Sequence, residues 1–281
     1  MRHNLQQLKS DKLALTGIII ILILAFIAIF APYLSLYDPL EVNMANRLQM
    51  PSEEHPLGTD QLGRDLLSRI IYATYVSITA AALATLMIIT FGVTIGAIAG
   101  YFGGIVDQAI MRIVDVLLAF PSLILTIAIA GILGPSLMNL IIAMTATGWV
   151  GYSRIIRGSV LSIKEKEFVE AARALGFGNL YIIARHIIPN VISPVVVIAT
   201  IDMGHIILSI TGLSFLGLGA QPPTPEWGTM LNEGKSFMTT APHLMIFPGL
   251  MIMITVLAFN FLGDGLRDAL DPRLRQVMMM K

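Results

Sequence analysis

Residues 167–178 read EFVEAARALGFG, a charged, helix-forming stretch in a chain that is otherwise mostly apolar. Apolar side chains recur there at the helical spacing i, i+3, i+4 and i+7, at Phe168, Ala171, Ala172 and Leu175. This spacing predicts a short helix with one apolar face. Two glycines, at 176 and 178, are expected to end the helix, because glycine accepts the left-handed conformation found at helix C-termini.

A second short helix is predicted directly after these glycines, from Asn179 to His186, ending at Pro189. The two helices would lie across the membrane surface, joined by a glycine turn. One interpretation is an amphipathic segment that rests on lipid. The other is a docking site for a second protein, since an alanine-rich face binds lipid poorly but permits close approach of another chain. The residues alone leave both open.

The composition of the whole chain indicates a membrane protein. Of its 281 residues, 56% are hydrophobic and only 13% are charged, about half the charged share of a soluble domain. We therefore predict an all-α integral membrane protein whose main solvent is lipid. The formal net charge is zero, so we expect no nucleic-acid partner, and the lack of cysteine excludes disulfides and thiolate metal sites.

Charge-free stretches locate the expected membrane spans, each of which needs about 20 apolar residues. Six spans are predicted, at about 13–36, 78–99, 115–133, 137–153, 191–211 and 244–262. Gly134 and Pro135 separate the third span from the fourth, because this pair favours a turn. The expected organisation is an N-terminal anchor helix with an external segment (1–76) and a core of five spans (77–281) that includes the loop 154–190.

Lysine and arginine predict the orientation, because basic residues concentrate on the cytoplasmic side of a membrane. With the N-terminus inside, fourteen basic residues are cytoplasmic: Arg2, Lys9, Lys12, Arg112, Arg154, Arg157, Lys164, Lys166, Arg173, Arg185, Arg267, Arg273, Arg275 and Lys281. Four are external: Arg47, Arg64, Arg69 and Lys235. We therefore expect both termini in the cytoplasm.

The opening stretch resembles a known signature. Glu170-Ala171-Ala172, followed by Gly176 and later by Pro189, is similar to the EAA loop of ABC importer permeases. The segment RHIIPN (185–190) resembles the peptide and nickel branch of that family, in which His186 replaces the usual isoleucine. The resemblance implies a type I importer fold whose loop forms coupling helices on a separate ATPase subunit. The residues implied in ATPase coupling are Glu170, Ala171, Ala172, Arg173, Gly176, His186 and Pro189.

The resemblance covers nearly the whole chain, through three further motifs in the family's order. HPLGTD with GRD (55–65) resembles the segment before the second span, 214–228 resembles the late external loop, and 260–268 resembles the C-terminus. The family implies a heterodimer with a second permease, two ATPase subunits that use ATP and Mg²⁺, and an extracytoplasmic substrate-binding protein. It also implies a bacterial cytoplasmic (inner) membrane location.

No catalytic motif survives inspection. Gly234-Lys235-Ser236 invites comparison with a phosphate-binding loop, but the required earlier glycine is Thr229. We therefore expect that this chain is not an enzyme and binds no cofactor of its own. Two rival classes, an ion-coupled secondary transporter and an intramembrane enzyme, would need internal symmetry or a catalytic pair within the spans, and neither is visible.

Asp202 and His205 are the ionisable pair of the fifth predicted span, three residues apart and therefore on one helix face. One interpretation is structural, in which the two side chains pair locally or contact a neighbouring subunit. The other is that they form a polar part of the translocation path. An imidazole beside a carboxylate suits transient binding of a metal ion, but two ligands are too few for a tight site. The sequence DMGH (202–205) resembles the nickel branch, which favours nickel, free or chelated, over dipeptides or oligopeptides as the substrate.

Overall fold

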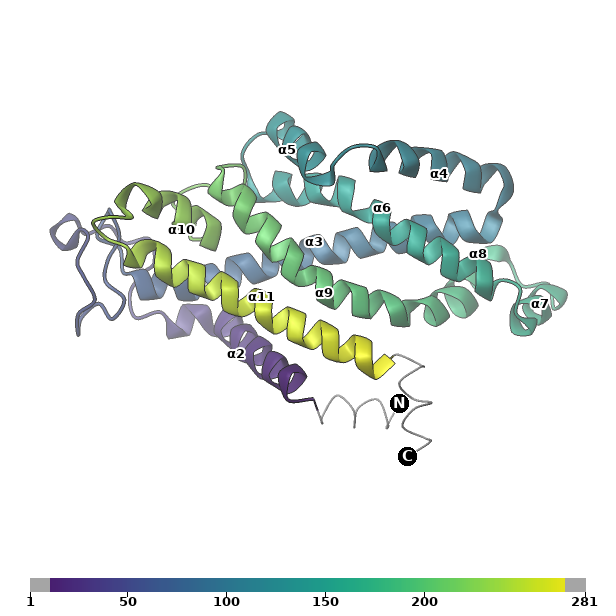
Figure 1. Cartoon of the computed structure of the whole chain (residues 1–281), viewed down its shortest axis with the longest axis horizontal. Coiled ribbons are helices and arrows are strands. Elements are labelled where there is room, and N and C mark those ends of the chain that lie inside the picture. The colour runs from purple at the N-terminus through teal and green to yellow at the C-terminus, as the bar shows by residue number, and fades with distance from the viewer. Residues whose placement is uncertain (1–10, 271–281) are drawn as a thin grey trace. The chain divides into compact units, whose positions relative to one another are not determined.

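The computed structural model describes residues 11–270, and within that range the chain contains helices but no β-strand. The long helices are α2 (Lys12–Leu34), α3 (Leu66–Phe102), α4 (Gly104–Leu118), α5 (Ser122–Leu133), α6 (Leu137–Ile163), α9 (Ile188–Phe215) and α11 (His243–Leu270) (Figure 1). The short elements are η1 (Met44–Asn46), α7 (Glu167–Ala174), α8 (Asn179–Ile182), η2 (Ile183–Ile187), α10 (Trp227–Gly234) and η3 (Lys235–Phe237). The all-α prediction is confirmed.

Four of the described helices are long and apolar enough to cross a membrane: α2, α3, α9 from Pro194 onward, and α11. A fifth span results if α4 and α5 count as one broken span. The fourth predicted span, 137–153, lies within α6, which has 27 residues but does not reach the same apolarity. At about 1.5 Å per residue, the 37 residues of α3 exceed the thickness of the hydrocarbon core.

The predicted straight span over 115–133 is corrected by the structure. The chain bends by 90° between α4, which ends at Leu118, and α5, which begins at Ser122. Pro121 lies in the break and provides the physical reason. Proline lacks the backbone N–H of a helix interior and disfavours helical conformation at the residue before it.

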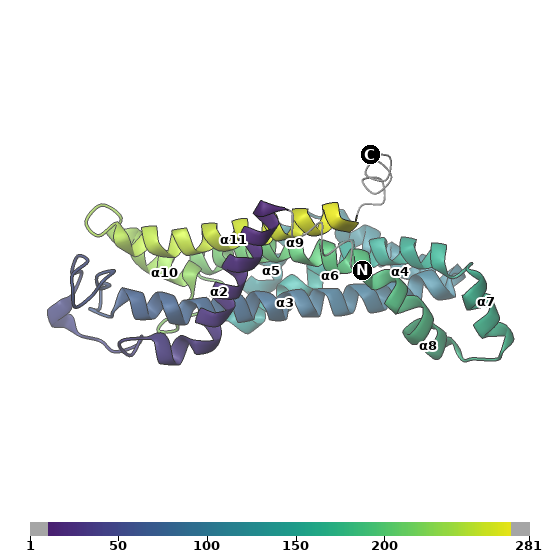
Figure 2. The same ribbon diagram turned by 90° about the horizontal axis from the view of Figure 1, so that it is seen from below.

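Among the described residues, one compact unit comprises 11–82, 134–140 and 200–270. In it α2 packs against α11, as both views show (Figures 1 and 2). Asp11 fixes the start of α2, because its carboxylate accepts hydrogen bonds from the backbone N–H groups of Leu13 and Ala14. The predicted boundary at 76/77 falls inside α3 and stays a prediction.

The other compact unit comprises residues 83–133 and 141–199, where α3 packs closely against α6. Gly92, Gly96 and Gly100 recur every fourth residue along the contact. A Cβ at Gly96 would lie 2.5 Å from the carbonyl oxygen of Ser153, and one at Gly100 would lie 2.8 Å from Cβ of Val160. Small residues at this spacing let helix backbones approach, as in membrane helix pairs generally.

Candidate functional site

Residues 167–187 form α7, a glycine turn, α8 and the π-helical turn η2 (Figure 2). They are called the α7–α8 segment below. Gly176 has φ +79°, the left-handed conformation that the sequence predicts. Its N–H donates to the carbonyl of Arg173, and the N–H of Phe177 donates to the carbonyl of Ala172. This pair of bonds is the Schellman motif, which satisfies the last carbonyls of α7.

The predicted apolar face of α7 is divided by the fold. Ala172 is buried, together with Val169, which the spacing argument did not include. Phe168, Ala171 and Leu175 are exposed, with Leu175 at 76%. Ala171 stays exposed because α7 turns Val169 and Ala172 inward, and its coupling role stays a prediction. The remaining apolar residues of α7 are free for another surface.

The second predicted helix does not end at Pro189. The chain continues from α8 through η2 into α9, which begins at Ile188. Pro189 is the second residue of α9 and directly follows the π-helical turn. A π-helical turn inside a continuous helix is frequent at functional sites. Here it carries Arg185 and His186.

Aromatic side chains gather on the exposed side of the α7–α8 segment. The rings of Phe177 and Tyr181 stack at 4.7 Å between centroids, and His186 lies 5.8 Å from Tyr181 and 6.3 Å from Phe168. Leu180, in α8, is 80% exposed. An apolar and aromatic surface of this kind is typical of a protein–protein interface.

The predicted coupling residues Glu170 and Arg173 differ in their surroundings. Glu170 lies in the first turn of α7 and is exposed. The guanidinium of Arg173 lies over the ring of Tyr101, 5.2 Å from its centroid. No local sequence pattern indicates this contact, because Tyr101 is more than 70 positions away from Arg173 along the chain.

Asp202 and His205 lie together on α9, as their spacing predicts. Nδ1 of His205 is 3.8 Å from Oδ1 of Asp202, and the side chains are 68% and 36% exposed respectively. Such a long ion pair between exposed groups adds little stability. Among residues 11–270, no group of three or more His, Cys, Asp or Glu side chains could hold a metal ion. The roles of Asp202 and His205 stay predictions.

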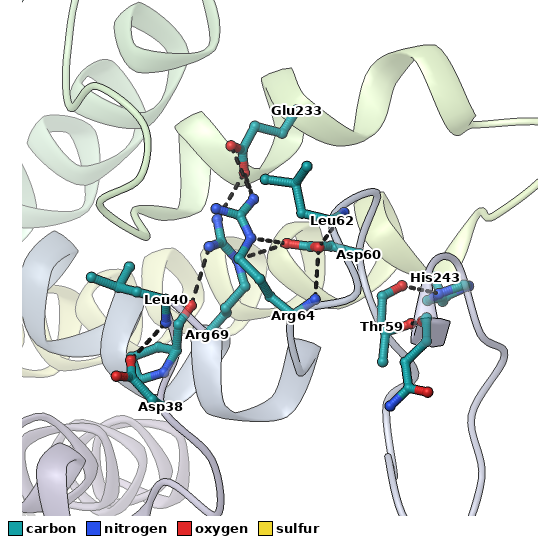
Figure 3. Close-up of polar contacts among 11 residues, drawn as sticks. Asp38, Leu40, Thr59, Asp60, Leu62, Arg64, Arg69, Glu233 and His243 are labelled. Carbon is teal, nitrogen blue, oxygen red and sulfur yellow. Dashed lines mark hydrogen bonds and ion pairs between the residues drawn. The ribbon is translucent and has the colours of Figure 1, made fainter. Parts of the chain in front are cut away.

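The HPLGTD and GRD motifs build a second polar site, the ion cluster, which consists of Asp60, Arg64, Arg69 and Glu233. Figure 3 shows both guanidinium groups directed at the two carboxylates. Nη2 of Arg69 donates to Glu233 at 2.7 Å, and Nη2 of Arg64 donates to the same carboxylate at 3.2 Å. Asp60 pairs with the Nε atoms of both arginines. Two positive and two negative charges therefore balance in a buried place.

Two buried histidines lie near these motifs, His55 within HPLGTD and His243 at the start of α11. His55 is 2.9 Å from Asp65 through its Nδ1 atom, and the Nε2 atom of His243 donates to the carbonyl of Thr59 (Figure 3). His243 is only 6% exposed and Trp227 is fully buried. The fold places both in the packed core of the segments between the spans.

Glu226 is also fully buried, beside Trp227. Its carboxylate caps α10 by accepting from the N–H of Thr229 at 3.0 Å, and it accepts from the hydroxyl of Ser77 at 3.3 Å. Burial raises the pKa of the Glu226 carboxyl, because the charged form loses its hydration. Hydrogen bonds to the carboxylate oppose this rise in pKa without cancelling it.

The comparisons with known proteins define the class of this membrane protein. Residues 92–276 match the family described as binding-protein-dependent transport system inner membrane component. Residues 1–51 match the N-terminal transmembrane domain of oligopeptide transport permease C. The chain belongs to this transport family, and it is a permease subunit of an ABC importer.

Its relatives include permeases named for different substrates. It is 48% identical to the dipeptide transport system permease DppC of Alkalihalophilus pseudofirmus, over 98% of this chain and 90% of that one. It is 45% identical to the glutathione permease GsiD of Pectobacterium atrosepticum, over 95% and 89%. It is 44% identical to the nickel permease NikC of Escherichia coli K12, over 94% and 95%.

A solved structure supports the fold. The inward-facing MetNI methionine ABC transporter matches 73% of this chain and 98% of its own chain, with a TM-score of 0.57 and 17% sequence identity. At that identity the likeness concerns the fold alone. The predicted type I importer fold and the predicted family are therefore confirmed.

Proposed function

We propose that the α7–α8 segment is the surface through which ATPase subunits drive this permease. The observation that carries the proposal is the division of α7: Val169 and Ala172 hold the helix to its own chain, while Phe168, Ala171 and Leu175 remain exposed. A membrane-surface helix would instead need a continuous apolar face and a strongly basic polar face. Glu167 and Glu170 give the first turn of α7 an acidic character.

The proposed machine contains this chain, a second and similar permease, two ATPase subunits and an extracytoplasmic binding protein. ATP and Mg²⁺ bind to the ATPase subunits, and this chain hydrolyses no ATP. Closure of the ATPases displaces the α7–α8 segment, and the rigid Gly176 turn transmits that displacement to the membrane helices. The central cavity then changes from inward to outward facing, and hydrolysis resets it.

We also propose that both termini lie in the cytoplasm of a bacterial cell. The distribution of basic residues supports this orientation, because fourteen fall in the segments predicted to be cytoplasmic and four in those predicted to be external. Two of those four, Arg64 and Arg69, pair with Asp60 and Glu233.

For the substrate we propose short peptides. The relatives named for dipeptides and glutathione share 48% and 45% of aligned residues with this chain. Nickel, free or chelated, is the second candidate, and the paired imidazole and carboxylate of His205 and Asp202 favour it. Both substrate classes suit an exposed carboxylate, which attracts either a peptide ammonium group or a divalent cation.

The test is uptake by cells that express the complete transporter, measured with radioactive nickel and with a labelled dipeptide. Gly176→Ala strains the left-handed turn, whereas Gly178→Ala is a matched control, because Gly178 has φ −67° and equally open surroundings. We expect Gly176→Ala to reduce uptake several-fold and Gly178→Ala to leave it unchanged. His205→Ala is measured beside them.

The outcomes separate the claims. Dipeptide uptake without nickel uptake supports peptides, whereas nickel uptake that falls in His205→Ala supports the second candidate and places His205 on the path. Equal uptake in Gly176→Ala and Gly178→Ala would contradict the coupling role of the turn. Uptake that persists without the ATPase subunits would instead favour an ion-coupled transporter.

A further inference from the structure

The end of α3 holds an aromatic residue that touches the α7–α8 segment on both sides of its turn. Tyr101 is 7% exposed and lies one residue before the end of α3. Its ring lies beneath the guanidinium of Arg173, near the end of α7. Its hydroxyl donates a hydrogen bond of 2.9 Å to Oδ1 of Asn179, the first residue of α8.

These two contacts use different parts of one side chain. The face of the ring attracts the cation of Arg173, and the hydroxyl at the far end of the ring binds the amide of Asn179. Gly176 lies between the two contacted residues and reverses the chain. Tyr101 therefore bridges the base of the turn, so that α7 and α8 share one attachment to α3.

Other contacts fix the surroundings of Tyr101 but do not reach the turn. The ring of Phe102 meets that of Tyr101 edge-on at 5.3 Å. Arg157, on α6, forms a bidentate pair with Asp107, on α4. This pair fixes the connection after α3, while Tyr101 alone among these residues contacts α7 and α8.

We propose that Tyr101 is a positioning residue of the coupling machinery, which holds the α7–α8 segment at the angle that transmits ATPase movement to α3. The proposal rests on the proposed function, since it assigns a residue to the coupling step. Because Tyr101 is only 7% exposed, it offers almost no surface to a substrate or an ATPase. Its loss should therefore leave ATP hydrolysis in place and reduce the transport that each ATP produces.

The test uses the complete transporter in proteoliposomes, with uptake and ATP hydrolysis measured in the same sample. Tyr101→Phe keeps the ring under Arg173 and removes the hydrogen bond, whereas Tyr101→Leu removes both contacts. Tyr75→Leu is the matched control, because Tyr75 is an exposed tyrosine of the same helix. Uptake of the labelled dipeptide and of radioactive nickel is divided by the ATP hydrolysed.

Amide hydrogen exchange over residues 167–182 supplies a second readout that does not depend on transport. We expect exchange in this range to accelerate about ten-fold in Tyr101→Leu and about five-fold in Tyr101→Phe, the effects of losing both contacts or the hydrogen bond alone. Uptake per ATP should fall in the same order. Tyr75→Leu should change neither quantity.

Each result decides one claim. Unchanged exchange in Tyr101→Leu would overturn the proposal, as would faster exchange with unchanged uptake per ATP, which would make Tyr101 a structural residue only. If the wild-type complex shows no ATP-dependent uptake of either probe, the proposed function fails. The exchange measurement then still decides whether Tyr101 positions the segment.

Discussion

The ion cluster and the α7–α8 segment are both built from charged stretches in an apolar chain, but they treat their charges in opposite ways. In the ion cluster, Arg64 and Arg69 are each only 1% exposed and pair with carboxylates. In the α7–α8 segment, Glu170 and Leu175 face outward. The contrast teaches that buried, satisfied charges fix a fold, whereas exposed groups remain available to a partner.

The largest effect is expected from breaking the ion cluster. Arg69→Met removes one positive charge and leaves Glu233 and Asp60 with a single arginine, so unfolding should become easier by about 3 kcal/mol. The free energy of unfolding can be measured by denaturant titration in detergent micelles. Arg47→Met is the control, because Arg47 is exposed and should change stability by less than about 0.5 kcal/mol. Equal effects of the two substitutions would show that the buried ion cluster does not contribute to the stability of the fold.

A smaller loss is expected at the packed contact of α3 with α6. Gly96→Ala would place Cβ 2.5 Å from the carbonyl oxygen of Ser153, which belongs to a helix backbone and cannot move far. The expected cost is about 2 kcal/mol, measured as a lower unfolding temperature of the purified chain. Gly151→Ala, on α6, meets no atom within 4 Å and should be neutral or slightly stabilising. A neutral Gly96→Ala would refute the close approach of the two helices.

A substitution in the turn of the α7–α8 segment should change stability less than it changes transport. Gly176→Ala forces an alanine into φ +79° and should cost about 1 kcal/mol, confined to the turn, since nothing surrounds it. Limited proteolysis within residues 167–187 should therefore speed up while the unfolding temperature stays nearly constant. A large drop in that temperature would remove the contrast between the two regions.

The smallest effect concerns the buried carboxylate of Glu226. Its hydrogen bonds described above come from Ser77 and Thr229, and neither donor is charged. Because burial raises its pKa in the folded state, the folded protein holds this proton more tightly than the unfolded chain does. Stability should therefore increase as pH falls through the raised pKa, and the gain is complete below the ordinary carboxyl pKa. Above the raised pKa, Glu226 is charged in both the folded and the unfolded state, and its burial lowers stability by an amount that no longer changes with pH.

Glu226→Gln tests this sign. The amide keeps an oxygen for the N–H of Thr229 and carries no charge, so the unfolding temperature should lose this part of its pH dependence and rise slightly at neutral pH. Glu41→Gln, at an exposed carboxyl, is the matched control and should leave the pH profile unchanged. A steeper profile in Glu226→Gln would contradict the assigned cause.

Much of the molecule could be predicted from local sequence. Apolar stretches identified the helices, and Gly176 marked the left-handed turn, because backbone conformation at a glycine depends on few neighbours. The bend between α4 and α5 was missed although Pro121 stands there, since the apolar run continues across it. Proline usually ends a helix, so the sequence does not predict continuation through Pro189, which follows a π-helical turn.

Composition and the order of the motifs are enough to define this protein as an all-helical ABC importer permease. Tertiary packing sets which charges are buried and paired, and which apolar residues of α7 stay exposed. It also brought Tyr101 to Arg173 and Asn179. Periodicity reports which residues share a helix face, but the contact each face makes depends on packing between segments distant in the chain.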